Sequence, residues 1–281
     1  MKSLQANTDA KKNASALAKS ATAVAVVAAR AAARVITKAA PDIGPLVWIE
    51  KGTADYVTQV DKDAEGSITD ILKREFPEAS ILGEELTPES ALSVEGLTFV
   101  IDPLDGTTNF LHGYPHYAVS IGVLEGPELI AGVVLNVPRG ELFTATVGCG
   151  TTRNGERVSV SQLSDPSRAL IGTGFPFKNP DILETYAKQF VEVSRHTAGI
   201  RRAGSAALDL ADVACGRFDG FWELILSPWD VAAGILLIRE AGGIVTNLQG
   251  APASPAQSPV VAGNPDIHPW LLRALQTADA S

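Results

Sequence analysis

The chain has 281 residues, of which 46% are hydrophobic and 20% charged, and its formal net charge is −9 at pH 7. This composition excludes disordered, collagen-like and coiled-coil proteins, and the length predicts one or two domains. The apolar stretch from Ala21 to Ala29 is short and Arg30 follows it, so we expect neither a membrane span nor a secretory signal. Because Cys149 and Cys215 are too few for a disulfide framework, we expect a reduced, cytoplasmic protein.

The charge is distributed unevenly along the chain. The first 50 residues contain seven Lys or Arg and three Asp or Glu, whereas the remaining residues contain 16 and 29. An acidic body does not by itself attract phosphate or nucleic acid. An anionic substrate would therefore need another source of positive charge, and a bound metal ion is the obvious one.

The first part of the chain is predicted to be helical. Residues 1–12 are expected to form a flexible polar tail, and residues 13–40 a helix that ends before Pro41. The apolar face of this helix is predicted at Val24, Val27, Ala31 and Val35, and a basic stripe at Arg30, Arg34 and Lys38. A second helix is predicted over residues 62–75.

The pattern then changes to strands and afterwards to alternating elements. Strands are predicted over residues 98–101, 117–124, 129–136 and 141–147, and turns between the later ones indicate antiparallel hairpins. After residue 160, strands are predicted over 169–174, 218–226 and 244–248, and helices over 182–196, 205–214 and 230–240. This order predicts a layered α/β sandwich: one domain over residues 13–281, with an α+β half to about 160 and an α/β half from about 161.

Carboxylates follow the strand predicted over residues 98–101. Asp102 and Asp105 come directly after it, and together with the main-chain carbonyl of Leu104 they offer hard oxygen ligands for Mg²⁺ or Mn²⁺. The free N–H groups of Gly106 and Thr107, where a helix can begin, would hold a phosphate. The alternative is that Asp105 only caps the turn, as Asp-Gly pairs often do.

Three further acids lie at the boundaries of predicted elements. Glu84 follows a short apolar run, Asp61 follows a strand-like stretch, and Asp230 begins a helix that contains Ala232, Ala233 and Gly234. Each alone can be explained as a surface acid or a helix cap. Together with Asp102 and Asp105 they supply the ligands that a two-metal phosphoryl-transfer site requires.

These motifs resemble those of the inositol monophosphatase family. Asp102-Pro-Leu-Asp-Gly-Thr107 is similar to its first signature, and the segment from Trp229 to Gly243 is similar to its second. The resemblance covers residues 50–265 and is greatest to the bacterial SuhB-type members. It implies the layered αβαβα sandwich of the sugar phosphatases. One departure is that Gly83 precedes Glu84 and Glu85 where some relatives have Thr or Ser.

The resemblance also implies a role for each matching residue. The implied ligands of two or three Mg²⁺ ions, for which Mn²⁺ could substitute, are Glu84, Asp102, the Leu104 carbonyl, Asp105 and Asp230. The implied catalytic residues are Asp61, Thr107 and Glu84, with Asp61 and Thr107 activating a metal-bound water. The implied substrate-binding residues are Asp105, Gly106, Thr107, Gly204, Ser205, Ala206, Glu223 and Asp230. Lys51 and Glu85 are expected beside the metal region.

The implied activity is hydrolysis of myo-inositol 1-phosphate or a related sugar-alcohol monophosphate, and Li⁺ is expected to inhibit it. The enzyme is expected to be a homodimer that does not associate with a membrane. The alternatives are a fructose-1,6-bisphosphatase, a nucleotide 3′-phosphatase, or a regulatory protein that binds RNA polymerase or antitermination factors. A second substrate phosphate would need basic residues near Gly204 and Glu223, and the candidates are Lys178, Arg201 and Arg202.

Overall fold

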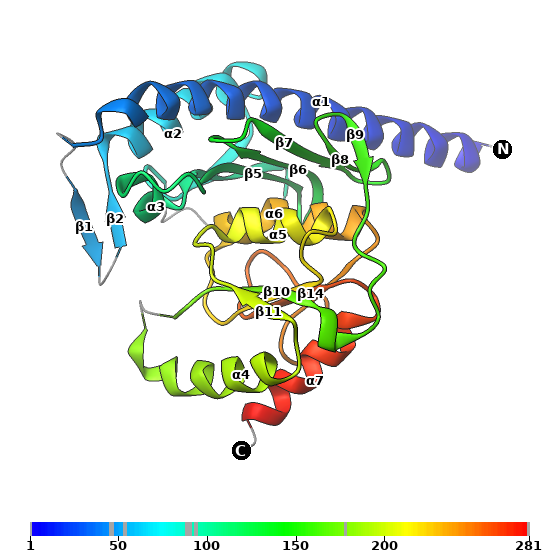
Figure 1. The fold of residues 1–281 in the computed structure, drawn as a ribbon. Helices are drawn as coiled ribbons and strands as arrows, with labels where there is room; N and C mark the ends of the chain where they lie inside the picture. The colour runs from blue at the N-terminus through cyan, green and yellow to red at the C-terminus, as the bar shows by residue number, and fades with distance from the viewer. Residues whose placement is uncertain are drawn as a thin grey trace.

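Five layers of helices and sheets make up the fold (Figure 1). The structure, a computed structural model, describes residues 2–44, 48–52, 55–87, 92, 95–176 and 179–279, with the backbone alone for residues 2–13, 50–52, 55–56, 180 and 279. Helices α1 (Lys2–Ala39) and α2 (Gln59–Glu75) cover one face of a seven-stranded sheet. Helices α5 (Ala206–Ala214) and α6 (Pro228–Glu240) lie between this sheet and a five-stranded one, whose outer face packs against α4 (Leu183–Arg195) and α7 (Ile267–Asp279). The predicted αβαβα sandwich is confirmed.

The seven-stranded sheet contains the strands of the first half of the chain, in sequence order. They are β3 (Ser80–Gly83), β4 (Leu97–Asp105), β5 (Ala118–Glu125), β6 (Glu128–Asn136), β7 (Glu141–Thr146), β8 (Gly150–Arg153) and β9 (Glu156–Val158). Only β3 and β4 pair in parallel, and the remaining neighbours are antiparallel. The hairpins expected between β5, β6 and β7 are confirmed, whereas β8 and β9 were not predicted. Two short strands near the N-terminal helices, β1 (Ile49–Gly52) and β2 (Asp55–Val57), form a separate hairpin.

The five-stranded sheet contains strands of the second half in the order β11-β10-β12-β14-β13. They are β10 (Leu170–Thr173), β11 (Gly199–Arg201), β12 (Gly220–Glu223), β13 (Ile244–Thr246) and β14 (Val260–Gly263). β10 pairs in parallel with β11 and β12, and the other pairs are antiparallel. The sequence analysis missed β11 and β14, because strands of three or four residues are too short to show a period. It also made the β12 strand too long, at residues 218–226.

Helix α1 differs from its prediction in two respects. Its backbone is helical from Lys2, whereas the helix was expected to begin at residue 13; no Gly or Pro interrupts that stretch. The predicted apolar face is only partly confirmed. Val24 and Val35 are partly buried and pack against the core, but Val27 is 52% exposed. The fully buried residues are Ala18, Ala21, Ala25, Ala28, Ala29, Ala32 and Ile36. This narrow alanine face allows α1 to lie close to the sheet.

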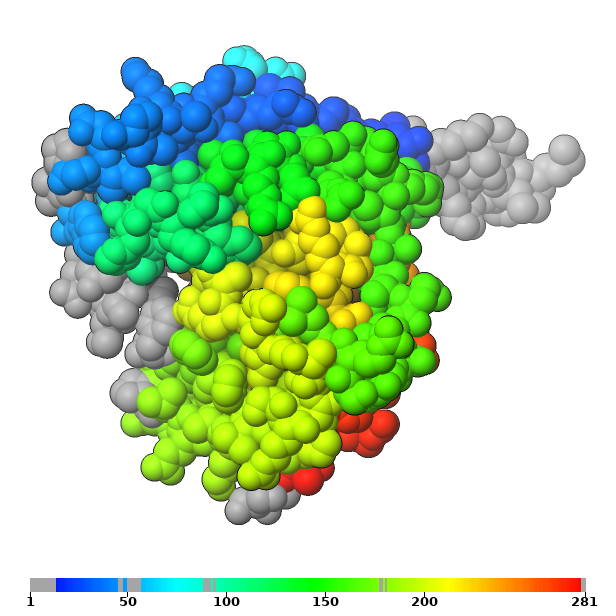
Figure 2. Space-filling model, in the orientation of Figure 1, coloured from blue at the N-terminus to red at the C-terminus, as the bar shows by residue number. Residues whose placement is uncertain are grey.

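By length and composition alone, the helix over Ala14–Asp42 is apolar enough to cross a membrane, contrary to the expectation from sequence. In the fold, however, it packs on α2 and on strands β5 and β6, and Figure 2 shows it along one end of the molecule. Its alanine face belongs to a core cluster that also contains Phe99, Ile101 and Ile121. Such packing is typical of the core helix of a globular domain.

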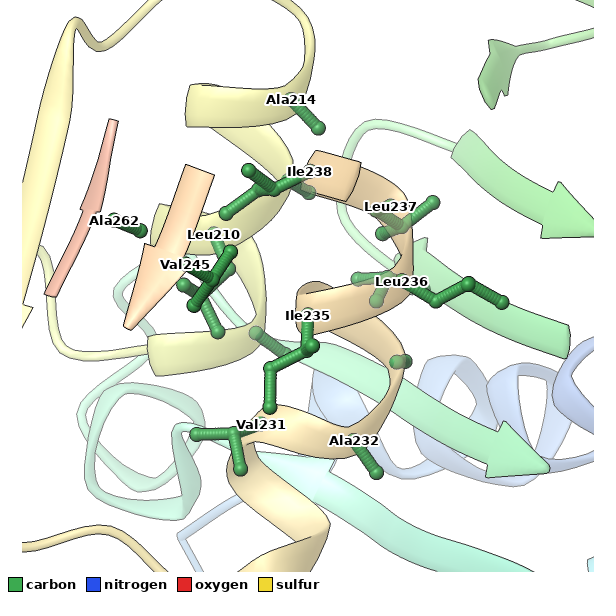
Figure 3. Close-up of a cluster of buried hydrophobic side chains, with 14 of the residues drawn as sticks. Leu210, Ala214, Val231, Ala232, Ile235, Leu236, Leu237, Ile238, Val245 and Ala262 are labelled. Carbon is green, nitrogen blue, oxygen red and sulfur yellow. The ribbon is translucent and has the colours of Figure 1, made fainter. Parts of the chain in front are cut away.

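Helix α6 lies unusually close to the seven-stranded sheet. A Cβ atom added at Gly122 of β5 would come within 2.4 Å of the Ala232 Cβ, and one at Gly132 of β6 within 2.8 Å of the Ala233 carbonyl oxygen. Gly234 likewise allows α6 to approach α5, because a Cβ at that position would come within 2.5 Å of Leu210 Cδ1. Figure 3 shows the apolar cluster around these helices, including Val231 and Ile235. The predicted small face of α6 is thereby explained, and it places the N-terminus of the helix beside β4.

Candidate functional site

Three aspartates from two distant parts of the chain converge at the end of β4. One carboxylate oxygen from each of Asp102, Asp105 and Asp230 lies within 4.8 Å of the others. Asp102 and Asp105 are buried at the end of β4, and Asp230 lies in the first turn of α6. The close packing of α6 on the sheet therefore brings the two signature motifs together.

The end of β4 has an irregular backbone. The strand was expected to end at residue 101, before Asp102, but it continues to Asp105. The register shifts between its pairs Asp102–Ser120 and Asp105–Ala118. Pro103 occupies this irregularity, since it has no N–H to donate to β5. The Leu104 N–H donates to Asp102 Oδ1 at 3.0 Å, and the Leu104 residue lines the adjoining cavity.

The electrostatics of the cluster oppose its full ionisation. Burial, followed by the charges of Glu84, Asp105 and Asp230, raises the pKa of Asp102 well above its ordinary value. Burial raises the pKa of Asp105 to about 6, although hydrogen bonds from Ser205 and Ala207 act in the opposite direction. Carboxylates crowded in this way are stable as anions only when a cation lies among them.

The residues present therefore fit a divalent metal ion. All the candidate ligands are oxygens, and Glu84 and the Leu104 residue line the same cavity as the three aspartates. Mg²⁺ and Mn²⁺ prefer such ligands, whereas softer ions prefer sulfur or imidazole. Among the residues that the structure describes, the members of this cluster are all aspartates, and none is a cysteine or histidine.

Asp230 and Asp61 occupy equivalent positions in their helices. Each is the third residue of its helix and accepts a hydrogen bond from the main-chain N–H of the N-cap residue, Ser227 at 2.6 Å and Thr58 at 2.9 Å. Capping was the alternative explanation for both acids. The structure shows that capping and a place in the site are compatible, because the caps use Oδ2 of each carboxylate.

Asp61 contacts the first signature through Thr107. It lies in the first turn of α2, which follows β2, and its Oδ1 accepts a hydrogen bond from the Thr107 hydroxyl at 2.9 Å. Burial is the largest influence on Asp61 and raises its pKa above the ordinary value, while the bonds from Thr58 and Thr107 lower it. Asp61 is thus a buried base joined to a hydroxyl that lines the cavity.

The turn between β4 and the short helix α3 (Thr107–Leu111) depends on Gly106. Its φ of 97° lies in the left-handed region, and a Cβ there would come within 3.2 Å of the Gly204 carbonyl oxygen. The Asn109 side chain fixes the same contact, since its Nδ2 donates to the carbonyls of His116 at 2.7 Å and Ala203 at 2.9 Å. Asn109 was missed in the sequence analysis.

A second missed residue is Glu65, one helical turn after Asp61 on α2. Its side chain is fully buried and accepts hydrogen bonds from the main-chain N–H groups of Glu85 at 2.8 Å and Leu86 at 3.0 Å. Gly83 leaves room for it, because a Cβ at that position would come within 2.0 Å of Glu65 Oε1. Glu65 therefore fixes the segment that holds Glu84. Its i, i+4 spacing from Asp61 was the available signal.

The second half of the chain contributes directly to the aspartate cluster. Ser205, the N-cap of α5, donates from Oγ to Asp105 Oδ2 at 2.5 Å, and the Ala207 N–H donates to the same oxygen at 2.8 Å. Gly204, Ser205 and Ala206 line the cavity beside them. The loop before α5 therefore orients a metal-site carboxylate as well as forming the wall of the cavity.

A cavity of about 550 Å³ adjoins the cluster and gathers most of the predicted site. Its wall includes Glu84, Asp102, Leu104, Asp105, Gly106, Thr107, Gly204, Ser205, Ala206, Glu223 and Asp230. Of the predicted site residues, only Asp61 lies behind it, bonded to Thr107. Glu223 enters beside Gly174, where a Cβ would come within 2.1 Å of the Glu223 carboxyl.

The basic residues expected near the cavity are placed differently from one another. Arg202 lines it, with its guanidinium carbon 5.4 Å from the centre of the Phe175 ring. Arg201 lies on β11 outside the wall, and Lys178 lies outside the described residues, as does the side chain of Lys51. Glu85 contributes its main-chain N–H to the Glu65 contact. The cavity wall that the structure describes thus contains one basic side chain and several acids.

Comparisons with known proteins agree with this arrangement. The family model described as the inositol monophosphatase family matches residues 17–280. The chain is 45% identical over 257 residues to the Nus factor SuhB of Pseudomonas aeruginosa, covering 90% of this chain and 94% of that protein. It is 44% identical over 227 residues to an inositol-1-monophosphatase of Synechocystis, covering 80% and 79%.

A solved structure shows the same fold. The crystal structure of the extragenic suppressor protein suhB from Bartonella henselae superposes with a TM-score of 0.85 at 41% sequence identity. The superposition covers 92% of this chain and 98% of that one. The similarity therefore extends over both sheets and over the cavity between the two signature motifs.

Proposed function

Because the chain belongs to the inositol monophosphatase family, we propose that it is a Mg²⁺-dependent phosphatase that hydrolyses myo-inositol 1-phosphate or a related sugar-alcohol monophosphate. The observation that best supports this is the convergence of Asp102, Asp105 and Asp230 at a cavity that Glu223 also lines. The three aspartates need a bound cation before an anionic phosphate can lie beside them. Glu223 needs none, because an uncharged alcohol can donate hydrogen bonds to it directly.

The groups that hold the phosphate are those at the start of α3. The first N–H groups of a helix have no acceptor within it, and Gly106 and Thr107 both line the cavity. When bound, Mg²⁺ would supply stabilisation of the charge that develops on the phosphate oxygens, held by Glu84, Asp102, the Leu104 carbonyl, Asp105 and Asp230. The acidic wall would otherwise repel the substrate.

Asp61 and Thr107 supply the proton acceptor. The Thr107 hydroxyl can accept a proton from an attacking water while it donates its own to Asp61, 2.9 Å away. A base works best when its pKa is near the operating pH, and burial moves the pKa of Asp61 in that direction. Thr58 holds the other oxygen of Asp61 and so fixes the orientation of the carboxylate.

The alcohol side of the cavity favours one phosphate over two. Glu223 accepts hydrogen bonds from hydroxyls but repels a second phosphate, and Arg202 is the basic residue of the described wall. Phosphate release should be measured for myo-inositol 1-phosphate, fructose 1,6-bisphosphate and adenosine 3′,5′-bisphosphate, with and without Mg²⁺. The highest kcat/KM on the inositol ester supports the proposal. A higher kcat/KM on either bisphosphate would instead indicate a bisphosphatase, with Arg202 binding the second phosphate. If none of the three substrates released phosphate in a Mg²⁺-dependent reaction, the proposal would be refuted.

We propose a second candidate function, binding to the transcription machinery, because a relative of 45% identity is named a Nus factor. The test uses RNA polymerase with antitermination factors as probe. A variant with Asp102, Asp105 and Asp230 all changed to Asn should lose phosphatase activity. If it is still retained by polymerase on a pull-down, binding is independent of catalysis. No retention of either protein would refute this function.

A further inference from the structure

Asp209 is a buried acid that the proposed chemistry does not use. It lies in the first turn of α5 and lines the same cavity as Glu223, although its exposed fraction is only 2%. Its Oδ1 is buried and has no hydrogen-bond partner among the described residues. An anionic carboxylate without donors is costly at such a position, so the geometry favours the neutral acid.

The surroundings of Asp209 point in the same direction. Glu223 on β12, Asp105 on β4 and Asp212 on the same helix all place negative charge near it, and Arg202 places an opposing positive charge. Burial is the largest cause, and together these groups raise the pKa of Asp209 well above its ordinary value. A bound cation would neutralise Asp105, but neither the burial nor Glu223 depends on one.

We propose that Asp209 keeps its proton and donates a hydrogen bond to a hydroxyl of the departing alcohol, beside Glu223, which accepts one. This inference rests on the proposed phosphatase function and specifies its substrate class. A neutral carboxyl is both donor and acceptor, whereas a carboxylate is an acceptor only. A pair of this kind matches two neighbouring hydroxyls of a polyol. It gives no attraction for an aryl leaving group or for a second phosphate.

The test compares Asp209→Asn with Asp209→Leu. Asp209→Asn keeps a hydrogen-bond donor and a carbonyl in a side chain of the same shape. Asp209→Leu removes the donor and the acceptor while keeping a similar side-chain volume. The measured quantity is the ratio of kcat/KM on myo-inositol 1-phosphate to kcat/KM on 4-nitrophenyl phosphate. We expect Asp209→Leu to lower this ratio about tenfold, the effect of one lost hydrogen bond. Asp209→Asn should keep most of the wild-type ratio. Equal ratios in all three proteins, or an equal loss in both variants, would overturn the inference.

The proton itself can be observed without turnover. Infrared difference spectra of the wild type and Asp209→Asn, taken with Mg²⁺ bound, should show the C=O stretch of a protonated carboxyl in the wild type alone. As pH rises and Asp209 loses its proton, this band should disappear, and the activity ratio should fall in the wild type but not in Asp209→Asn. A carboxylate band throughout would overturn the inference.

The two proposals fail in distinguishable ways. If the wild type releases no phosphate from either ester, the phosphatase function is wrong whatever the spectrum shows. If it hydrolyses both esters but the ratio is insensitive to Asp209→Leu, only the role of Asp209 is wrong. Thermal unfolding of each variant checks that the fold is retained, and Asp209→Asn keeps the test valid if Asp209→Leu does not fold.

Discussion

The Thr107 hydroxyl lies 2.9 Å from Asp61 Oδ1, although 45 residues separate them in the chain. Thr107 begins α3 and Asp61 lies in the first turn of α2, so this contact joins the helical layer to the end of β4. It is the one described hydrogen bond between a predicted catalytic residue behind the cavity and one in its wall. The first prediction concerns whether the two act as a unit.

Thr107→Val removes the hydroxyl and keeps the shape, and Asp61→Asn removes the proton acceptor. If a proton passes from Thr107 to Asp61, the double variant should lose little more kcat than the worse single variant, because effects within one relay are not additive. The measurement is single-turnover phosphate release for all four proteins. Losses that multiply in the double variant would show that the residues act independently.

Asp102→Asn should weaken metal binding and stabilise the metal-free protein. The variant replaces one anionic ligand with a neutral one, and it removes charge repulsion from the buried cluster. Calorimetric titration with Mn²⁺ should show lower affinity, and the Tm of the metal-free variant should exceed that of the wild type at neutral pH. Wild-type affinity for Mn²⁺ together with retained kcat would exclude Asp102 as a ligand.

The same cluster predicts how the stability of the metal-free wild type depends on pH. Asp105 has a folded pKa of about 6, above the unfolded value near 3.8, so its contribution is fully present below the unfolded pKa and is lost as pH rises through 6. The free energy of unfolding without metal should therefore fall between about pH 4 and pH 7. Adding Mg²⁺ should remove most of this fall. A metal-free protein that gains stability over that range would contradict the prediction.

Glu65→Ala should impair the metal site without touching it. The two main-chain N–H groups of Glu85 and Leu86 would lose their acceptor, so the segment that holds Glu84 would no longer be fixed. Each buried donor left unsatisfied costs about 1–3 kcal/mol. We expect weaker Mn²⁺ binding and a lower Tm, with partial recovery of both in Glu65→Gln, whose carbonyl can still accept. If Tm alone falls, Glu65 stabilises the fold without positioning Glu84.

The close approach of α6 to the sheet predicts opposite effects at two glycines. Gly122→Ala would place a methyl group within 2.4 Å of the Ala232 Cβ, and overpacking of this kind costs about 1–3 kcal/mol. Gly66→Ala, in the interior of α2 with nothing within 4 Å, should instead stabilise by about 0.5–1 kcal/mol. Urea unfolding of both variants measures this. Similar midpoints for the two would disprove the packing argument.

Glu223→Gln should weaken recognition of a polyol more than that of a simple leaving group. A hydrogen bond to a charged acceptor contributes about 1.5–3 kcal/mol, so kcat/KM for myo-inositol 1-phosphate should fall about tenfold or more. The value for 4-nitrophenyl phosphate should fall less, since that leaving group has no hydroxyl. Equal losses on the two substrates would assign Glu223 to the structure of the site rather than to recognition.

Much of the protein is determined by local sequence. The helices α2, α4, α5 and α6 and the long strands β5, β6 and β7 were predicted within a few residues, because each has a strong period and a clear end signal such as Pro77 or Gly216. The two signatures identified Asp102, Asp105 and Asp230, because motifs of that length are specific. The short strands β11 and β14 were missed, since their stability comes from neighbours distant in the chain.

The resemblance implied that Asp61 and Thr107 act together, but only the tertiary structure decided which side-chain contacts hold the acids of the site in place. Asp61 contacts Thr107, Ser205 contacts Asp105 and Glu65 contacts the Glu85 N–H, and none of these pairs is close in sequence. The same holds for α1, whose fully buried face is formed by alanines and Ile36, while Val24 and Val35 are only partly buried beside it. Periodicity shows which residues are apolar, but the face that is buried depends on how closely two backbones approach. The raised pKa values of Asp105 and Asp209 likewise come from burial and neighbouring charges, which exist only once both sheets have closed around α5 and α6.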